Sequence, residues 1–400
     1  MREVSRRTRE LGTENAFVVL GEVEKLIAEG KSIVSFCIGQ PDFPTPDNIR
    51  LAGIRAITEG KTGYTPSPGI PALREAVAGY LSRTRGVPFR PEEVVCGCGG
   101  KPFIGYAILT LTDYGEGHEV VFPNPGFPIY SSQVVASGAV PVPVALREAR
   151  GFNFDLDDLK RKVNDKTRLL ILCSPGNPTG NLLHRAELEQ IADIVRRYDN
   201  LWIYSDEVYS GLVYDGEFTS IAAMPGMKER TIVADSASKT YAMTGWRIGY
   251  AANAALAPYF TRWVTNTDSC PPHPNQYAVV EALNGPQHEV RRMRDVFLER
   301  RDRIVRGLNE LPGWRCLSPG GAFYVWPNVT EACRIVGAKD SDELRKRLLY
   351  EAGVAVLADT HFGSRVEGDG EHVRFSYASS FEAIDDGLAR IAQFMKKNRR

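Results

Sequence analysis

Residues 169–180 have the sequence Leu-Leu-Ile-Leu-Cys-Ser-Pro-Gly-Asn-Pro-Thr-Gly, an apolar run that ends in a turn. An unbroken apolar run closed by Pro, Gly and Asn predicts a strand that is buried on both faces. Similar runs occupy residues 94–98, 119–122, 201–205 and 231–235, and helical spacing appears between two of them at Leu188, Ile191, Ala192 and Val195. Strands that alternate with helices predict an α/β fold in which helices flank a mostly parallel sheet.

The pattern changes after about residue 283. A long helical stripe that includes Met293, Phe297 and Ile304 is followed by strand-like runs at 321–326 and 372–378 and by a last amphipathic helix. We therefore expect a large domain at residues 41–285 and a smaller α+β domain at residues 286–400. Residues 1–40 are expected to form an N-terminal segment that packs on the small domain.

Charge and cysteine content exclude several classes of protein. Lys plus Arg and Asp plus Glu both number 49, and a nucleic-acid-binding protein would carry a basic excess. We expect no membrane span, because no run of about 18 apolar residues occurs. The N-terminus lacks the apolar core of a secretory signal, and the seven cysteines form no C-x-x-C pair. The sequence thus predicts a cytoplasmic protein with reduced thiols and no metal site.

Chemically useful residues follow five of the predicted strands. They are Gly99-Gly100-Lys101, the turn from Pro123 to Phe127, the turn that contains Asn177, Asp206 with Tyr209, and Ser236 to Lys239. Ligands of open α/β sheets bind outside the carboxyl ends of the strands, so these turns are expected to meet at one site.

This set of residues suits pyridoxal phosphate, which needs a lysine for its aldehyde, an acid for its ring nitrogen and donors for its phosphate. Lys239 is the candidate for the Schiff base and for acid/base work at Cα, and Asp206 is the candidate for the ring nitrogen. Gly99 and Gly100 would let backbone N–H groups at a helix start approach the phosphate, and Arg247 would add a charged contact.

Two other classes of function fit the sequence less well. A nicotinamide-dependent dehydrogenase would show G-x-G-x-x-G after its first strand, and residues 97–102 lack the last glycine. A cofactor-free regulator with the same fold would be indicated by loss of Lys239 or Asp206, and both are present. Esterase, zinc protease and NTPase motifs do not occur.

The sequence Ser-Ala-Ser-Lys-Thr-Tyr-Ala-Met-Thr-Gly-Trp-Arg-Ile-Gly-Tyr at 236–250 closely resembles the lysine signature of class I aminotransferases, which are fold-type I pyridoxal phosphate enzymes. The resemblance runs from residues 38–43 to residues 373–377 and includes the segments 64–70, 174–180 and 205–209. It implies the family's fold, its cofactor and a homodimer with shared active sites.

The resemblance also implies a role for each matching residue. Lys239 matches the Schiff-base lysine and Asp206 the partner of the ring nitrogen, while Asn177 and Tyr209 match donors to the ring hydroxyl. Phe127 matches the aromatic residue that stacks on the ring. The phosphate-side positions are Gly99, Gly100, Lys101, Ser236, Ser238, Arg247 and, from the partner subunit, Tyr64. Arg374 and Gly39 match the groups that bind the substrate α-carboxylate, beside Asn177.

The reaction and the substrate stay partly open at this stage. We expect transfer of an α-amino group between an L-amino acid and a 2-oxo acid, and Lys101 favours an aspartate- or glutamate-like donor. The alternative is a biosynthetic enzyme that uses the same Cα carbanion for β- or γ-elimination, replacement, C–C bond formation or oxidation. His273 and His361 lie in loops that depart from the family pattern, where they either shape the pocket, act as additional acid/base groups or are ordinary surface-loop residues.

Overall fold

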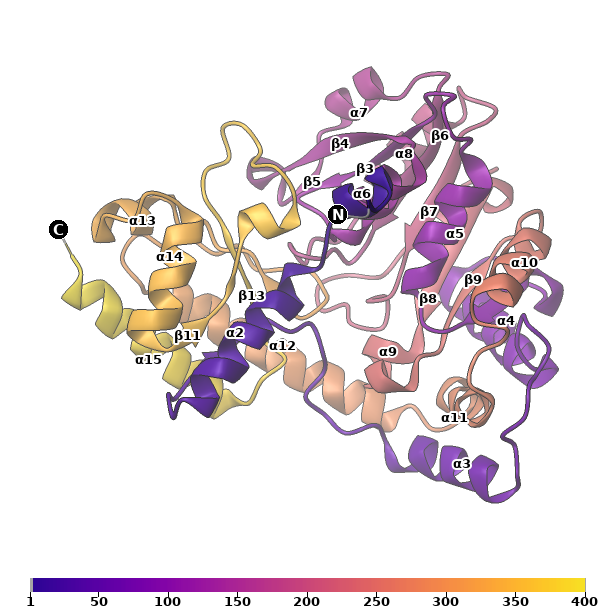
Figure 1. The fold of residues 1–400 in the computed structure, drawn as a ribbon, viewed down its shortest axis with the longest axis horizontal. Helices are drawn as coiled ribbons and strands as arrows, with labels where there is room; N and C mark the ends of the chain where they lie inside the picture. Colours follow the sequence, from indigo (N-terminus) through magenta and orange to yellow (C-terminus); the bar gives the residue numbers. More distant parts are fainter. Residues whose placement is uncertain (1–2, 400) are drawn as a thin grey trace.

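The computed structural model describes residues 3–399 and is built around one large sheet (Figure 1). Its eight strands have the order β2-β9-β8-β7-β6-β3-β4-β5. They are β2 (Val94–Gly97), β3 (Glu119–Asn124), β4 (Val140–Arg147), β5 (Asn153–Phe154), β6 (Thr167–Cys173), β7 (Trp202–Asp206), β8 (Thr231–Ser236) and β9 (Gly249–Ala252). Only β9 and β5 run against the common direction, which confirms the predicted mostly parallel sheet.

Helices cover both faces of this sheet because alternate strand residues are apolar on each side. Leu169 and Ile171 of β6 face one layer, and Leu170 and Leu172 face the other. The first layer contains α5 (Lys101–Leu111), α6 (Ile129–Ser137) and α10 (Ala257–Thr267). The second contains α4 (Pro71–Arg85), α7 (Leu156–Lys162), α8 (Arg185–Val195) and α11 (His273–Asn284), with α3 (Asp47–Thr58) packed outside α11. Burial on both faces explains why the strands are unbroken apolar runs.

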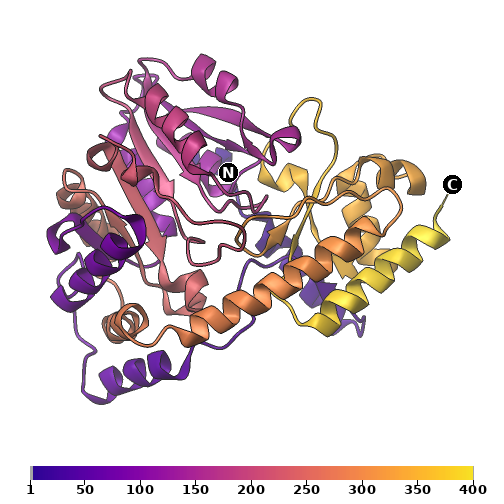
Figure 2. The same cartoon turned by 180° about the vertical axis from the view of Figure 1, so that it is seen from behind.

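The C-terminal part forms the smaller α+β unit that the sequence predicts. The long helix α12 (His288–Asn309) lies beside α15 (Phe381–Lys397), as Figure 2 shows. They cover the three-stranded sheet of β10 (Tyr324–Val325), β13 (Val373–Ser376) and β12 (Leu357–Ala358), together with α13 (Thr330–Val336) and α14 (Ser341–Arg347). The strand expected at 321–326 pairs with β13 at Tyr324 and Val325 and makes an isolated bridge at Gly321, because Ala322 has a φ of 59° and interrupts the extended chain.

The N-terminal segment contacts both units. The prediction put all of residues 1–40 on the small domain, whereas α1 (Arg6–Glu10) packs on α6 of the large sheet. The hydroxyl of Ser132 donates a hydrogen bond to the carbonyl of Gly12 and fixes this contact. Further along, α2 (Asn15–Ala28) packs against β12, and β1 (Val34–Ser35) pairs in parallel with β11 (Val354–Ala355) of the small domain. The segment therefore crosses the junction between the two units.

Among residues 3–399, no helix combines the length and the apolar composition that a membrane crossing requires.

Candidate active site

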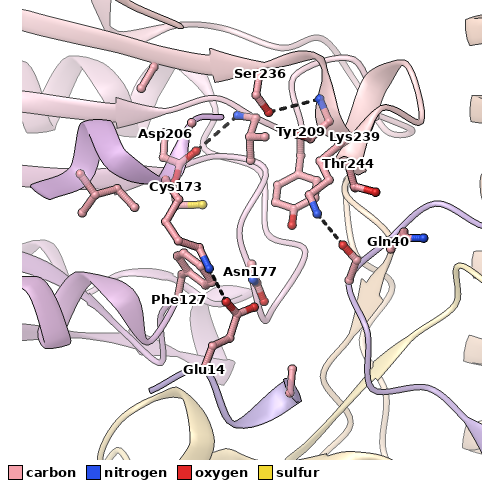
Figure 3. Close-up of a pocket in the computed structure, with 18 of the residues that line it drawn as sticks. Glu14, Gln40, Phe127, Cys173, Asn177, Asp206, Tyr209, Ser236, Lys239 and Thr244 are labelled. Carbon is pink, nitrogen blue, oxygen red and sulfur yellow. Dashed lines mark hydrogen bonds and ion pairs between the residues drawn. The ribbon is translucent and has the colours of Figure 1, made fainter. Parts of the chain in front are cut away.

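A cavity of about 620 Å³ lies where the carboxyl ends of the parallel strands face the small domain. It is lined by residues of the large sheet, of the small domain and of the N-terminal segment (Figure 3). All the site residues predicted from the sequence line this cavity except Gly99 and Tyr64. The five turns at the strand ends thus meet, as the parallel topology requires.

Lys239 enters the cavity from α9 (Ala237–Thr240), the short helix that follows β8. The hydroxyl of Ser236 caps this helix by accepting a hydrogen bond from the backbone N–H of Ser238 at 3.3 Å. The Nζ of Lys239 donates to the carbonyl oxygen of Gly39. Burial, together with the positive charges of Arg374 and Arg247, lowers the pKa of Lys239 to about 8. A much larger fraction of this amine than of an ordinary lysine is therefore neutral and nucleophilic near neutral pH.

Asp206 lies at the end of β7, on the floor of the cavity. The hydroxyl of Tyr130, from α6, donates a hydrogen bond to its Oδ2 at 2.7 Å. Burial raises the pKa of Asp206 to about 6, although the Tyr130 hydrogen bond opposes the shift. A cationic partner in the cavity, such as a protonated ring nitrogen, would stabilise the charged form of this buried carboxylate.

The Gly99-Gly100 turn and Gly249 of β9 shape a cradle of backbone N–H groups at the start of α5. Gly99 has a φ of 94°, and a Cβ there would lie 2.1 Å from Nη2 of Arg247. A Cβ on Gly249 would lie 2.2 Å from the backbone nitrogen of Gly100. Arg247 donates to the carbonyl oxygens of Thr244 and Cys98, and its exposed guanidinium also lines the cavity. The cradle combines a helix N-terminus with a positive charge, and it suits a phosphate.

The opposite wall is built around Arg374 of β13, which is 3% exposed. Its guanidinium donates to Oδ1 of Asn177 at 2.9 Å and to the carbonyl oxygen of Cys37, while its buried Nε has no partner. The ring of Tyr324 stacks on it at 4.5 Å. No carboxylate of the described residues pairs with this buried cation, so the guanidinium can bind an anionic group of a ligand.

Tyr209 and Gly39 complete this wall through Tyr324. The hydroxyls of Tyr209 and Tyr324 lie 2.7 Å apart, and burial raises the pKa of Tyr209 well above its usual value. A Cβ on Gly39 would lie 2.1 Å from the Tyr324 hydroxyl oxygen, so only glycine fits there. Phe127 also lines the cavity, and its ring meets that of Tyr130 edge-on.

Lys101 begins α5, but its ammonium is held by the carboxylate of Glu14 at 2.6 Å. The sequence placed Lys101 with the phosphate-side residues, whereas in the structure its partner comes from the N-terminal segment. Tyr64 is 89% exposed and does not reach the cavity of its own chain. Its loop contacts His273, predicted to lie in a loop but found at the start of α11, whose Nδ1 lies 3.0 Å from the carbonyl oxygen of Gly63.

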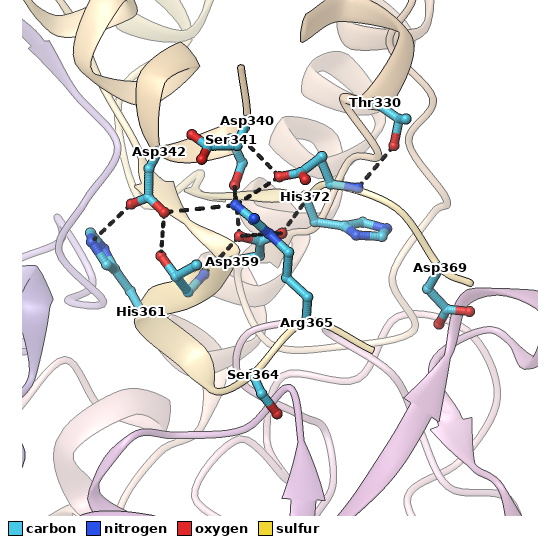
Figure 4. Close-up of polar contacts among 12 residues, drawn as sticks. Thr330, Asp340, Ser341, Asp342, Asp359, His361, Ser364, Arg365, Asp369 and His372 are labelled. Carbon is cyan, nitrogen blue, oxygen red and sulfur yellow. Dashed lines mark hydrogen bonds and ion pairs between the residues drawn. The ribbon is translucent and has the colours of Figure 1, made fainter. Parts of the chain in front are cut away.

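His361 belongs to a polar network in the small domain (Figure 4). Its Nε2 lies 4.0 Å from Oδ1 of Asp342, and burial lowers its pKa. Arg365 connects the same loop to Asp359 and Glu371. His361 also lines a small recess beside Arg374, so this loop supports the wall on which the substrate carboxylate is expected.

Sequence reasoning missed several residues that hold the site in place. Tyr324 and Glu14 come from elements distant in sequence from the predicted motifs, and Tyr130 lies three residues after Phe127 in the helix that follows the predicted turn. A buried ion-pair cluster fixes the ends of β7 and β8: Arg85 donates to Glu207 at 2.7 Å and to Asp235 at 2.6 Å. Asp235 in turn accepts a hydrogen bond from the backbone N–H of Ser236 at 2.6 Å. Asp235 is a charged residue at the end of the strand predicted at 231–235, which is the one signal that could have drawn attention to it.

The family model described as aminotransferase class I and II matches residues 31–391. The chain belongs to this family. It is therefore an aminotransferase, and the resemblance found in its sequence is confirmed.

Other aminotransferases match it over their whole length. An aspartate aminotransferase from Bacillus sp. (strain YM-2) is 37% identical over 396 residues, which cover 98% of this chain and 99% of that protein. An asparagine–oxo-acid transaminase from Streptococcus mutans is 35% identical over 401 residues, covering 99% and 100%. The crystal structure of an aspartate aminotransferase from Rhizobium meliloti matches this aminotransferase with a TM-score of 0.93 at 31% identity, and both chains are covered completely.

Proposed function

We propose that this aminotransferase uses pyridoxal 5'-phosphate on Lys239 to move an α-amino group between an acidic L-amino acid and a 2-oxo acid. The observation that carries the proposal is one cavity in which the amine of Lys239, the carboxylate of Asp206, the N–H cradle of α5 and the unpaired cation of Arg374 all face inward.

The residues present fit the cofactor. The cradle, whose close packing leaves no room for a Cβ at Gly99 or Gly249, suits the phosphate, with Ser236, Ser238 and Arg247 beside it. Asp206 would face the ring nitrogen, Asn177 and Tyr209 the ring hydroxyl, and Phe127 the ring itself. Lys239 has the neutral amine that attachment of an aldehyde requires, because burial lowers its pKa to about 8.

When bound, pyridoxal phosphate supplies an aldehyde for an amine and an electron-withdrawing ring for the bond cleaved at Cα. Asp206 keeps a proton on the ring nitrogen, because a buried carboxylate favours a cation next to it. Arg374 and Asn177 bind the α-carboxylate and so orient Cα. The freed amine of Lys239 moves the proton at Cα, and its pKa near 8 suits transfer in both directions near neutral pH.

Lys101 supports an acidic donor. Its ammonium lines the same cavity as Arg374, where it can take a second carboxylate of the substrate. The names of the relatives, aspartate aminotransferase and asparagine–oxo-acid transaminase, point to substrates of this size.

We also propose a homodimer with shared sites. Tyr64 is exposed in a single chain and matches a residue that serves the partner's phosphate in the family. Three large apolar side chains on α3, Leu51, Ile54 and Ile57, are exposed as well, at 57–59%. Apolar surface of this kind is typical of protein interfaces.

Trapping of the cofactor tests the proposal. Purified protein with pyridoxal phosphate is reduced with borohydride and digested, and the masses of the peptides are measured by mass spectrometry. We expect the reduced adduct on the peptide that contains Lys239 and none in the Lys239→Ala variant. An adduct on another lysine of the wild type, or one that persists in Lys239→Ala, would refute the assignment.

A further inference from the structure

Glu14 and Lys101 form an ion pair at the wall of the active-site cavity. Glu14 precedes α2 and makes no capping hydrogen bond to that helix, so its carboxylate is available to Lys101 at 2.6 Å. Both residues line the cavity, and Figure 3 shows Glu14 beside Phe127. The Glu14 side chain is 23% exposed and that of Lys101 is 44% exposed. The pair is therefore partly withdrawn from water.

Aromatic rings surround this pair. The Nζ of Lys101 lies 5.5 Å from the ring centroid of Phe127 and 5.9 Å from that of Phe17. Phe17 is 60% exposed although it lines the cavity, and Ala16 adds a further apolar surface there. A substrate side chain that reaches this wall therefore meets apolar faces as well as the ion pair.

The pairing changes what the wall can bind. While Glu14 neutralises Lys101, an uncharged side chain can cover the pair without leaving a cation unpaired. Without Glu14, the same side chain would desolvate a lone ammonium, which is unfavourable. A substrate carboxylate faces the opposite situation, because it must compete with Glu14 for Lys101.

We propose that Glu14 is a specificity-determining residue: by neutralising Lys101 it lets the site accept amino acids with uncharged aromatic or aliphatic side chains as the second substrate of the exchange. The side-chain carboxylate of an acidic substrate replaces Glu14 as the ion-pair partner of Lys101. This inference rests on the proposed function, since it concerns the substrates of the same site.

The test compares two amino acids in the holoenzyme. The rate of the half-reaction with aspartate and with phenylalanine is measured for the wild type and for Glu14→Gln, which keeps the shape of the side chain. We expect kcat/KM for phenylalanine to fall and the aspartate-to-phenylalanine ratio to rise by up to about fivefold, the scale of a partly exposed ion pair. In the Lys101→Met background, Glu14→Gln should cause no fall with phenylalanine, because no ammonium is left unpaired.

A matched control is Glu10→Gln, which removes the same charge from a residue that pairs with Arg6 outside the cavity. Its substrate ratio should equal that of the wild type. An unchanged ratio in Glu14→Gln, or an equal fall with phenylalanine in both backgrounds, would overturn the inference.

Binding separates this inference from the proposed function. Succinate and 3-phenylpropanoate are titrated into the holoenzyme, and their binding is measured by calorimetry. We expect Glu14→Gln to increase the affinity for succinate relative to that for 3-phenylpropanoate by a similar factor. If the wild type converts no amino acid, the proposed function fails, while these two ligands still decide whether Glu14 sets the preference. Unchanged relative affinities would refute the role of Glu14.

Discussion

The amine of Lys239 has a pKa near 8 because the cavity buries it beside Arg374 and Arg247. An ordinary lysine has a pKa of about 10.4. Attachment of the aldehyde needs the neutral amine, so the rate of pyridoxal phosphate capture by cofactor-free protein should rise about tenfold per pH unit below pH 8 and level off above it. Stopped-flow absorbance measures this rate. A rate that still climbs tenfold per unit between pH 8.5 and 10 would show an unperturbed lysine.

Arg374 is a buried cation with no carboxylate partner among the described residues, and the proposed function assigns the substrate α-carboxylate to it. The Arg374→Met variant should raise the dissociation constant of an α-carboxylate ligand about thirtyfold or more, as loss of a desolvated charge pair does. Calorimetric titration with succinate measures the loss, and Arg303→Gln, which removes a surface arginine paired with Asp385, is the matched control. Wild-type affinity in Arg374→Met would mean that the carboxylate binds elsewhere.

Single residues differ in how far the sequence could place them. Lys239 and Asp206 follow buried strands in a specific motif, so both their elements and their site were predictable. The partner of Lys101 was not, because Glu14 lies 87 positions away in a helical segment without a motif. The same holds for Tyr130, whose hydroxyl reaches Asp206 from the helix after β3. Contacts of this kind depend on tertiary packing, which local patterns do not encode.

Among the elements, β9 sets the geometry of the phosphate cradle. A methyl group on Gly249 would lie within 2.3 Å of backbone atoms of Gly99 and Gly100, and backbone cannot move aside without opening the turn. Gly249→Ala should therefore weaken pyridoxal phosphate binding about tenfold or more, the scale of an overpacked contact. Fluorescence titration measures the affinity.

Gly21→Ala is the matched control for this substitution, since a Cβ at Gly21 of α2 meets nothing within 4 Å. It should bind the cofactor as the wild type does. A Gly249→Ala protein with wild-type affinity would show that the cradle at the start of α5 does not hold the phosphate.

The strands of the large sheet were predictable where burial on both faces makes them continuous apolar runs, as in β6 and β8. Three strands were missed, and one of them, β5, has only the two residues Asn153–Phe154. β4 contains Pro141 and Pro143, which are unfavourable in a strand, and it lies toward the edge of the sheet. β9 has only four residues, Gly249–Ala252, and merges with the lysine motif. Short or proline-containing strands carry too weak a pattern to be recognised.

At the scale of the whole molecule, the site exists only where the two domains meet. Lys239 and Asp206 belong to the large sheet and Arg374 to the small domain. The junction is held by polar contacts such as Glu148 with Arg315 and His372. Although burial opposes it, hydrogen bonds from His372, Asn328 and Arg315 lower the pKa of Glu148 to about 2. The carboxylate therefore stays charged throughout the neutral pH range.

Hybrid dimers test whether the sites are shared. Tyr64→Phe should weaken cofactor binding about tenfold, as loss of a hydrogen bond to a charged group does. When Tyr64→Phe subunits are paired with Lys239→Ala subunits, one site of each hybrid should regain wild-type affinity, because it combines an intact Lys239 with the partner's intact tyrosine. Fluorescence titration of tag-purified hybrids measures it. Hybrids with only the weakened affinity, or a monomer in analytical ultracentrifugation, would contradict the shared site.

The central claim is transamination on a cofactor held by Lys239. Its most direct test is a single turnover: holoenzyme is mixed with aspartate in the absence of any oxo acid, then denatured, and its products are quantified by mass spectrometry. The account predicts one oxaloacetate per site and an equal amount of pyridoxamine phosphate. Release of ammonia, or a changed amino acid with the cofactor recovered as pyridoxal phosphate, would contradict it and would indicate elimination, replacement or oxidation instead.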